Sequence, residues 1–200
     1  MAGPTVEFWQ SRFLSRQTAW DRGQANPQLH AWVADGAIPP GRVCVPGCGS
    51  GWEVAVLARH GFEVTALDYA PAAVAQTLAL LGRESLTANV VEANVLEWSP
   101  QRPFDAVYEQ TCLCALHPDH WVEYAARLHA WLQPGGSLLA LFMQVRREPA
   151  EQQVLGPPYH CDINAMRALF PASRWRWPKP PYPVVPHTIG TELAVRLVRL

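Results

Sequence analysis

Residues 42–51 read Arg-Val-Cys-Val-Pro-Gly-Cys-Gly-Ser-Gly, an apolar run that stops at small residues with glycine at alternate positions. A helical pattern follows over residues 52–59, so this region predicts a buried strand, a tight turn and the start of a helix. The glycines allow positive φ angles in the turn and let backbone N–H groups approach a ligand closely.

A second strand is expected over residues 61–68, and it ends in Asp68. Two parallel strands joined by a helix place the glycine turn and Asp68 at the same edge of the sheet, which is where ligands bind in open α/β sheets. A carboxylate at that edge can accept hydrogen bonds from both hydroxyls of a ribose. The plainer interpretation is a tightly packed βα turn without a ligand, but the position of the acid favours a nucleoside.

The glycine spacing narrows the choice of nucleoside ligand. A dinucleotide fingerprint has the form G-x-G-x-x-G, whereas Gly47, Gly49 and Gly51 place the third glycine one residue early. No Lys-Ser or Lys-Thr pair follows, which argues against a triphosphate. The loop resembles motif I of class I S-adenosylmethionine-dependent methyltransferases, whose cofactor carries no phosphate.

Composition excludes several classes of protein. The chain has 200 residues, 49% hydrophobic and 16% charged, which suits one soluble globular domain over residues 1–200. The formal net charge of −1 provides no basic surface for nucleic acid or for an anionic membrane, and the apolar runs are too short to span a bilayer. Residues 1–10 lack the basic start and apolar core of a signal peptide. We expect a cytoplasmic monomer that acts on a small molecule.

The cysteines do not predict a metal site or a disulfide framework. There are five, with no C-x-x-C pair and no paired zinc spacing: Cys44, Cys48, Cys112, Cys114 and Cys161. We expect buried thiols that act as small apolar residues.

The remaining pattern predicts a three-layer, Rossmann-like α/β fold. Its seven-stranded sheet is mostly parallel with an antiparallel last strand, and a helical lid of residues 1–40 precedes a core of residues 41–200. Further strands are expected over residues 90–93, 104–109, 137–142, 175–177 and 191–200, the fifth strand being preceded by a stop at residues 133–136. Further helices are expected near residues 8–13, 27–33 (ended by Asp35-Gly36 and Pro39-Pro40), 72–81, 118–131 and 162–170.

Three details of this prediction remain open. The aromatic N-terminal segment is either a lid over the mouth of the sheet or an arm anchored on the core. Residues 178–186 are too rich in proline for a central strand and are read as an extended loop. Loops 156–160 and the prolines near Pro180 are expected to wall a pocket, and His187 is read as a surface residue.

Taken together, the motifs identify a family resemblance over nearly the whole chain. The chain resembles the thiopurine S-methyltransferase family and its related thiol, halide and thiocyanate methyltransferases. The residues that carry the resemblance are Phe8-Trp9-Gln10, Thr18-Ala19-Trp20-Asp21, the loop 45–51, Leu67-Asp68, residues 108–116, Leu132-Gln133-Pro134-Gly135-Gly136 and Gly156-Pro157-Pro158-Tyr159.

The resemblance implies S-adenosylmethionine as cofactor and a role for each matched residue. The segment from Trp9 to Thr18 would cover the cofactor, and the loop with Gly47 and Gly49 would contact its methionine part. Asp68 would bind the ribose hydroxyls. Asn94 and Val95 would flank the adenine, and Trp20 would lie beside the methyl acceptor.

One departure from the family pattern concerns the acceptor. Members of the family place an Asp-Arg pair after the fourth strand, where this chain has Glu109-Gln110. Gln110 keeps the ability to form hydrogen bonds with the cofactor but lacks the charge of arginine. Glu109 and Tyr159 are expected to position the acceptor, the alternatives being a helix cap for Glu109 and loop packing for Tyr159.

The expected reaction is methyl transfer to a small soft nucleophile, most simply the sulfur of a thiol or thiopurine. The reaction requires alignment of the acceptor with the methyl group and exclusion of water, rather than a metal or a catalytic triad. For Cys112 and Cys114 a packing role is therefore favoured over a catalytic one. Halide, thiocyanate, selenium or tellurium acceptors remain alternatives. So do a protein that binds the cofactor without turnover and a nicotinamide-dependent oxidoreductase, although the glycine spacing argues against the latter.

Overall fold

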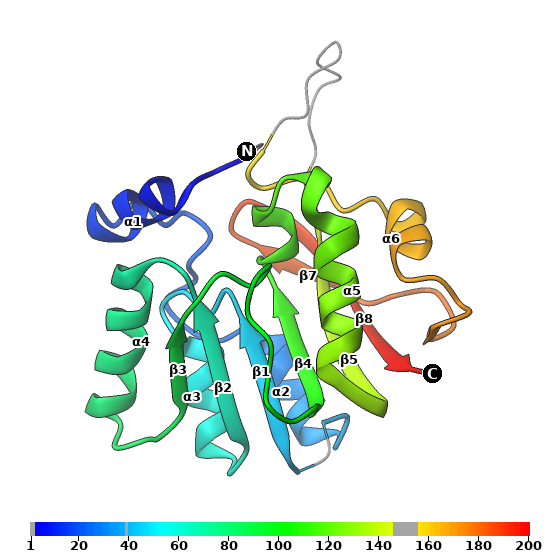
Figure 1. Ribbon diagram of the computed structural model, residues 1–200, viewed down its shortest axis with the longest axis horizontal. Helices are drawn as coiled ribbons and strands as arrows, with labels where there is room; N and C mark the ends of the chain where they lie inside the picture. Colours follow the sequence, from blue (N-terminus) through cyan, green and yellow to red (C-terminus); the bar gives the residue numbers. More distant parts are fainter. Residues whose placement is uncertain (1–2, 39, 146–155) are drawn as a thin grey trace.

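The structure, a computed structural model, describes residues 3–38, 40–145 and 156–200. Its centre is a mixed sheet with the order β3-β2-β1-β4-β5-β8-β6, and β7 pairs with β8 (Figure 1). Strands β1 to β5 run parallel, and β8 runs antiparallel to β5. The strands are β1 (Arg42–Pro46), β2 (Glu63–Asp68), β3 (Asn89–Glu92), β4 (Phe104–Gln110), β5 (Leu132–Gln144), β6 (Trp175–Arg176), β7 (Val184–His187) and β8 (Gly190–Arg199).

The helices begin where the sequence supplies caps. Asn26 accepts a hydrogen bond from a backbone N–H of α2, and the predicted cap Asp162 accepts two from α6. Proline occupies the first turn of α4. The helices are α1 (Val6–Leu14), α2 (Pro27–Ala34), α3 (Trp52–Arg59), α4 (Pro71–Arg83), α5 (Trp121–Trp131) and α6 (Ile163–Leu169), with short 3-10 helices η1 (Leu113–Ala115) and η2 (Pro118–His120).

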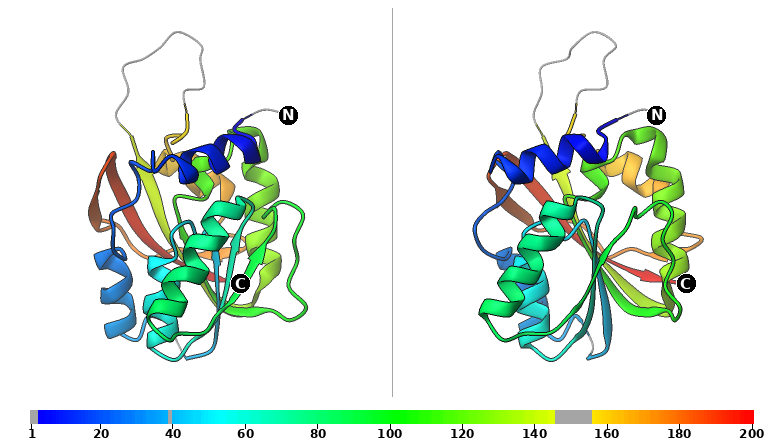
Figure 2. Two further views of the ribbon diagram at one scale, coloured as in Figure 1. Left: turned by 90° about the vertical axis from the view of Figure 1, so that its left-hand side faces the viewer. Right: turned by 60° about the vertical axis from the view of Figure 1, so that its left-hand side comes forward.

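Alternation along the strands divides the core into two halves. Val43 and Val45 of β1 belong to the half that also contains buried residues of α2, α3 and α4, whereas Cys44 belongs to the half filled by α5 and α6. Because successive side chains point to opposite faces, one strand serves both layers. The predicted three-layer, mostly parallel fold is confirmed, with helices on both faces of the sheet (Figure 2).

Helix α1 lies across the carboxyl edge of the parallel strands (Figures 1 and 2). Phe13 packs against Ala70 and Ala73 at the start of α4, and the Gln10 side chain accepts a hydrogen bond from the Ala72 N–H at 2.8 Å. The position of α1 therefore encloses the edge at which the sequence predicts a ligand.

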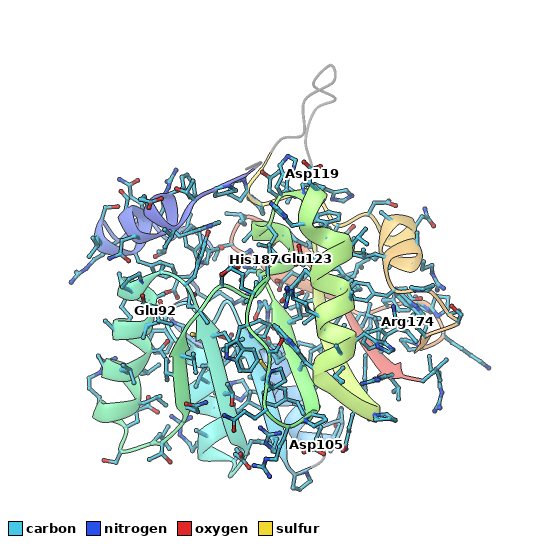
Figure 3. The ribbon with its side chains drawn as sticks, in the orientation of Figure 1. Glu92, Asp105, Asp119, Glu123, Arg174 and His187 are labelled. Carbon is cyan, nitrogen blue, oxygen red and sulfur yellow. The ribbon has the colours of Figure 1, made fainter. Side chains whose placement is uncertain are left out.

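Asp105 organises the opposite, amino-terminal edge, where Figure 3 labels it. Its carboxylate accepts hydrogen bonds from the Arg42 N–H and from the Gln133 side chain, each at 2.7 Å. These contacts tie the start of β4 to the starts of β1 and β5, well away from the ligand edge.

Several details differ from the prediction. Helix α2 is not part of a lid, because Leu29 and Trp32 are buried in the core and the Trp32 ring contacts the Tyr108 ring edge-on. The expected lid of residues 1–40 is thus divided between α1 over the sheet edge and α2 on its side, and Pro39 lies outside the described residues. The expected stop at residues 133–136 lies within the bounds of β5.

The C-terminal part contains a strand that the sequence did not predict. Residues 184–187, expected as an extended loop and a surface histidine, form β7, whose one partner among the described strands is β8. Pro186 is tolerated because an edge strand leaves one side without ladder partners. His187 is 9% exposed, so the prediction of a surface residue was wrong.

Among the described residues, no helix combines the length and apolar character that a bilayer span requires.

Candidate active site

A cavity of about 280 Å³ is lined by residues of α1 and by residues at the carboxyl edge of the sheet. Its wall combines aromatic residues of the N-terminal arm, the glycine turn, the ends of β2, β3 and β4, and parts of the C-terminal half. Of the residues expected to bind the cofactor or acceptor, those in the wall are Trp9, Trp20, Gly47, Gly49, Asp68, Asn94 and Val95. The structure therefore brings most of the predicted site together.

The glycine turn has the backbone that the sequence predicted. Gly47, Gly49 and Gly51 have φ angles of 62°, 54° and 82°. A Cβ atom on Gly47 would lie 3.0 Å from the Cβ of Cys112, and one on Gly51 would lie 2.7 Å from the hydroxyl of Thr77. At these two positions both the backbone conformation and the close approach of a neighbour require glycine.

Asp68 stands at the end of β2 and fixes the turn. Its Oδ2 accepts a hydrogen bond from the Gly49 N–H at 3.0 Å, and its Oδ1 accepts one from the Ala70 N–H at 2.9 Å. Burial raises the pKa of this carboxyl group, while the two backbone donors favour its ionised form. Each oxygen keeps a further lone pair for a ligand donor, which suits a pair of vicinal hydroxyls.

Asp21 fastens the N-terminal arm to the glycine turn. Its carboxylate accepts hydrogen bonds from the Ser50 hydroxyl at 2.5 Å, the Trp52 indole at 2.9 Å and the Gly23 N–H at 2.7 Å. Thr18 does not line the cavity; its carbonyl oxygen accepts the Asp21 N–H at 2.8 Å. Asp21 was quoted in a family motif but was not expected to have a role of its own.

Three aromatic rings close the arm side of the cavity. Trp9 and Trp20 meet edge-to-face with centroids 5.3 Å apart, and Phe13 contacts Trp20 in the same way at 5.9 Å. This geometry is the favourable one for aromatic pairs. The arm thus acts both as a cover for the cavity and as an anchor on α4.

Asn94 and Val95 line the cavity just beyond β3. The Asn94 side chain accepts a hydrogen bond from the Leu96 N–H at 3.0 Å and donates to Glu97 at 3.2 Å, which holds the turn. Val95 is buried. The apolar Val95 therefore lies in a turn whose shape is fixed by Asn94.

Glu109, at the end of β4, does not reach the cavity. It is 2% exposed, and its Oε1 accepts a hydrogen bond from the Leu113 N–H at 2.6 Å. Burial raises the pKa of Glu109 to about 7, and hydrogen bonds from backbone N–H groups oppose the shift. The structure shows the capping arrangement that the sequence left as an alternative for this residue.

Gln110 points into a buried polar cluster rather than into the main cavity. Its amide nitrogen donates to both carboxylate oxygens of Glu192, at 3.0 and 3.2 Å, and its oxygen accepts from the Tyr108 hydroxyl at 2.7 Å. Gln110 lines a second, smaller cavity of about 60 Å³ beside the glycine turn. No local sequence pattern marks Glu192 as part of this cluster, because its partners come from β4 and from Asn26.

Thr111 lines both cavities and was not expected from the sequence as a site residue. Its φ angle is 59°, an uncommon conformation for a β-branched residue. Its hydroxyl donates to the Gln110 carbonyl oxygen at 2.7 Å. Strain of this kind persists only where the surroundings enforce it, and it is frequent at functional sites.

Apart from the Thr111 hydroxyl, the wall formed by the segments after β4, at and after the end of β5 and before β8 is apolar. Its apolar residues are Cys112, Cys114, Ala115, Leu116, Met143, Pro157, Pro158 and Ile189. Tyr159 is buried behind it, and its N–H donates to the Cys114 carbonyl oxygen at 2.7 Å. The prolines near Pro180, expected in this wall, do not line the cavity.

All five cysteines are buried and free, as the sequence predicted. Burial raises the pKa of Cys112 and Cys114 well above that of an exposed thiol, and Glu109 nearby adds to the shift for Cys112. Both thiols therefore stay protonated at neutral pH, which fits packing rather than nucleophilic chemistry.

Comparison with known proteins agrees with this geometry. Residues 4–179 match the family model for thiopurine S-methyltransferase. The chain is 30% identical over 164 residues to "Thiocyanate methyltransferase 1" of Arabidopsis thaliana, covering 81% of this chain and 70% of the relative. It is 28% identical over 158 residues to "Probable thiol methyltransferase 2" of the same plant, covering 78% and 68%.

A solved structure shares the fold. The chain superposes on a Burkholderia thailandensis 1,6-didemethyltoxoflavin-N1-methyltransferase, crystallised with S-adenosylhomocysteine, with a TM-score of 0.74. The two are 22% identical, and the match covers 97% of this chain and 86% of the other. With the family model spanning most of its length, the chain belongs to the thiopurine S-methyltransferase family and is a class I S-adenosylmethionine-dependent methyltransferase.

Proposed function

We propose that this methyltransferase transfers a methyl group to the sulfur of a small, uncharged thiol. The observation that carries the proposal is the apolar part of the cavity wall. Among the described residues, the segments after β4 and β5 and before β8 contribute no charged side chain to the cavity. An anionic acceptor would find no counter-ion in this wall, whereas a neutral thiol would find apolar contacts and two sulfur atoms, of Cys114 and Met143.

The residues near β2 and β3 suit an adenosyl group. In this proposal the free lone pairs of Asp68 receive the ribose hydroxyls, and Asn94 and Val95 flank the adenine. Gly47 and Gly49 admit the methionine part because they carry no side chain. Trp9 covers the nucleoside, and the Thr18 carbonyl acts indirectly by holding Asp21.

The acceptor side is positioned by residues in and behind the wall. Trp20 is the aromatic residue that meets the acceptor directly. Glu109 acts from behind by holding the turn at residues 111–113, and Tyr159 acts by fixing the loop with Pro157 and Pro158 on Cys114. Both are positioning residues rather than catalytic residues.

The chemistry asks little of the protein. When bound, S-adenosylmethionine supplies a methyl group activated by a sulfonium. The task of the side chains is to align the acceptor and exclude water. A thiol with a pKa of about 8.5 is partly ionised near neutral pH and needs only a weak base. That requirement matches a wall without an ionised base.

The test is a panel of acceptors incubated with S-adenosylmethionine, with S-adenosylhomocysteine quantified by mass spectrometry. Neutral thiols such as ethanethiol and 2-mercaptoethanol should be methylated, with rates that rise as the pH approaches the thiol pKa. Turnover of iodide or thiocyanate without turnover of any thiol would contradict the proposal. Binding of the cofactor without turnover of any acceptor would favour a non-catalytic binding protein, and binding of NADH in its place would favour an oxidoreductase.

A second candidate acceptor is thiocyanate or a halide. The relative named thiocyanate methyltransferase favours it, as does Arg12, a cation in the wall of the main cavity. The Arg12→Gln variant separates the two candidates. It should reduce turnover of thiocyanate selectively if the anion is the acceptor, and should leave turnover of neutral thiols unchanged if our proposal holds.

We also propose that the protein works as a cytoplasmic monomer without a nucleic-acid partner. The net charge of −1 supports a small molecule over nucleic acid. Light scattering coupled to size exclusion measures the mass in solution, and a mass of one chain, 22.2 kDa, is expected.

A further inference from the structure

The second cavity lies directly beside the first. Four residues line both of them: Trp20, Gly47, Gly49 and Thr111. The two cavities therefore adjoin at the glycine turn, and a ligand that lies against this turn in the first cavity is next to the second.

Apart from the buried Cys48 and Tyr108, four ionisable side chains line the second cavity, and three of them already have hydrogen-bond partners. Both oxygens of Asp21 accept hydrogen bonds from the arm and the glycine turn. Glu53 accepts the Asn26 N–H at 3.0 Å. His187 accepts the Ile189 N–H, and burial lowers its pKa to about 4, so it is neutral at pH 7.

Arg22 is the fourth, and its donors are mostly unused. A guanidinium has five N–H donors, of which Nη1 donates to the Pro186 carbonyl oxygen at 2.5 Å. Its Nε is buried and has no hydrogen-bond partner among the described residues. Within residues 3–38, 40–145 and 156–200, no carboxylate lies within 4.0 Å of Arg22.

Nearby acids do not neutralise this cation by contact. Glu53 and Glu192 lie close enough for Arg22 to favour their ionised forms, but burial dominates and raises the pKa of both. Glu192 receives its hydrogen bonds from Gln110 and Asn26 instead. Arg22 thus brings a fixed positive charge to a cavity whose acids have other partners.

We propose that the second cavity holds the amino-acid end of the cofactor and that Arg22 binds its α-carboxylate. The inference rests on the proposed function, since it assumes the nucleoside lies between Asp68 and Asn94. Arg22 has the planar donor geometry that matches a carboxylate, and the Pro186 carbonyl holds one side of the guanidinium in place. The small volume, about 60 Å³, suits an amino-acid end rather than a second nucleoside.

The test compares two ligands that differ only in the carboxylate: S-adenosylhomocysteine and its decarboxylated analogue. Titration calorimetry measures both in the wild type and in Arg22→Gln. We expect the variant to lose about 10- to 100-fold in affinity for S-adenosylhomocysteine, the range of a hydrogen bond to a charged group. Affinity for the decarboxylated analogue should not change, and Arg22→Lys should restore part of the loss.

Arg12→Gln is the matched control, because Arg12 is a cation in the wall of the first cavity. It should not discriminate between the two ligands. A selective loss in this variant, an equal loss of both ligands in Arg22→Gln, or no loss in Arg22→Gln would each overturn the assignment.

Failure of the proposed function has a different signature. Asp68→Asn should lower the affinity for both ligands equally, because both carry the nucleoside. A wild type that binds neither ligand would refute the nucleoside site itself, and the Arg22 assignment with it. If Arg22→Gln keeps the wild-type affinity for S-adenosylhomocysteine while Asp68→Asn loses affinity, the Arg22 assignment alone is refuted.

Discussion

The amide nitrogen of Gln110 lies 3.0 and 3.2 Å from the two carboxylate oxygens of Glu192, joining β4 to β8 across the intervening β5. Asn26 at the start of α2 donates to the same carboxylate at 3.0 Å. Three distant parts of the chain therefore converge on one buried acid. Gln110 therefore uses its amide group to hydrogen-bond a buried acid, at the position where the family pattern has an arginine.

Glu192 should make stability depend on pH. Burial raises its pKa to about 8 from an ordinary value of 4.5, so the folded protein keeps a proton that the unfolded chain loses. Its contribution to the free energy of unfolding falls as the pH rises from about 4.5 to 8, by at most about 1.4 kcal/mol per pH unit. Denaturant titrations at pH 5, 6.5 and 8 should show that the free energy of unfolding of Glu192→Gln changes less with pH than that of the wild type.

Glu109 also lowers the free energy of unfolding as the pH rises toward its pKa of about 7. The Glu192→Gln variant should therefore remove only part of the pH dependence of stability. Glu123→Gln is the control, since Glu123 is an exposed partner of Arg127. Parallel profiles for the wild type and Glu192→Gln would contradict the prediction.

Asp68→Asn should weaken binding of S-adenosylhomocysteine by about tenfold or more, because hydrogen bonds to a charged group are worth about 1.5–3 kcal/mol. An asparagine also has one acceptor oxygen for the two backbone donors, Gly49 and Ala70, that Asp68 now serves. Calorimetry measures the affinity, and Asp119→Asn, at an exposed carboxylate outside the cavity wall, is the control. Equal affinities in wild type and Asp68→Asn would exclude this carboxylate from the site.

Two glycines should respond oppositely to alanine. Gly51→Ala combines a φ of 82° with a contact 2.7 Å from Thr77, so we expect a loss of about 1–3 kcal/mol in the free energy of unfolding. Gly82 lies in the last turn of α4, and a Cβ added there would have nothing within 4 Å, so Gly82→Ala should stabilise the protein by about 0.4–1 kcal/mol. Thermal unfolding measures both, and a shift of the same sign in the two variants would be incompatible with this account.

The hydrogen bond from the Ser50 hydroxyl to Asp21 should slow the release of S-adenosylhomocysteine, because it holds the N-terminal arm on the glycine turn. Asp21→Ala should raise the dissociation rate of S-adenosylhomocysteine about tenfold, the equivalent of about 1.4 kcal/mol. Stopped-flow tryptophan fluorescence measures this rate. Adding Ser50→Ala should change little further, since the partner is already gone. Strict additivity of the two substitutions would show that they act independently.

The buried thiols should be unreactive. Native protein should release no thionitrobenzoate from Ellman's reagent at pH 8 on the time scale of minutes, whereas unfolded protein should react at all five cysteines. A fast-reacting thiol in the native protein would point to Cys112 or Cys114, the two that line the main cavity, and would reopen a chemical role for them.

The sequence by itself determined the framework and half of the candidate site. Local patterns encode the strand that ends at Pro46, the glycine turn and Asp68, because spacing and backbone freedom act over a few residues. The parallel arrangement follows from strand and helix alternation. These features predict a nucleoside site at one edge of the sheet without any knowledge of distant contacts.

Only the tertiary structure decided what meets across that edge. Arg22, His187 and Glu192 all lie more than 70 residues from Gln110 in the sequence, and no local pattern marks their approach to it. Glu109 and Gln110 are adjacent, yet they point to opposite sides of the sheet, one to a helix start and one to a polar cluster. The alternation of the two side chains can be read from the sequence. Which side of the sheet offers Gln110 a buried partner depends on how α2 and β8 pack against β4 and β5. Long-range packing therefore determines the charge of the site, whereas local sequence determines its frame.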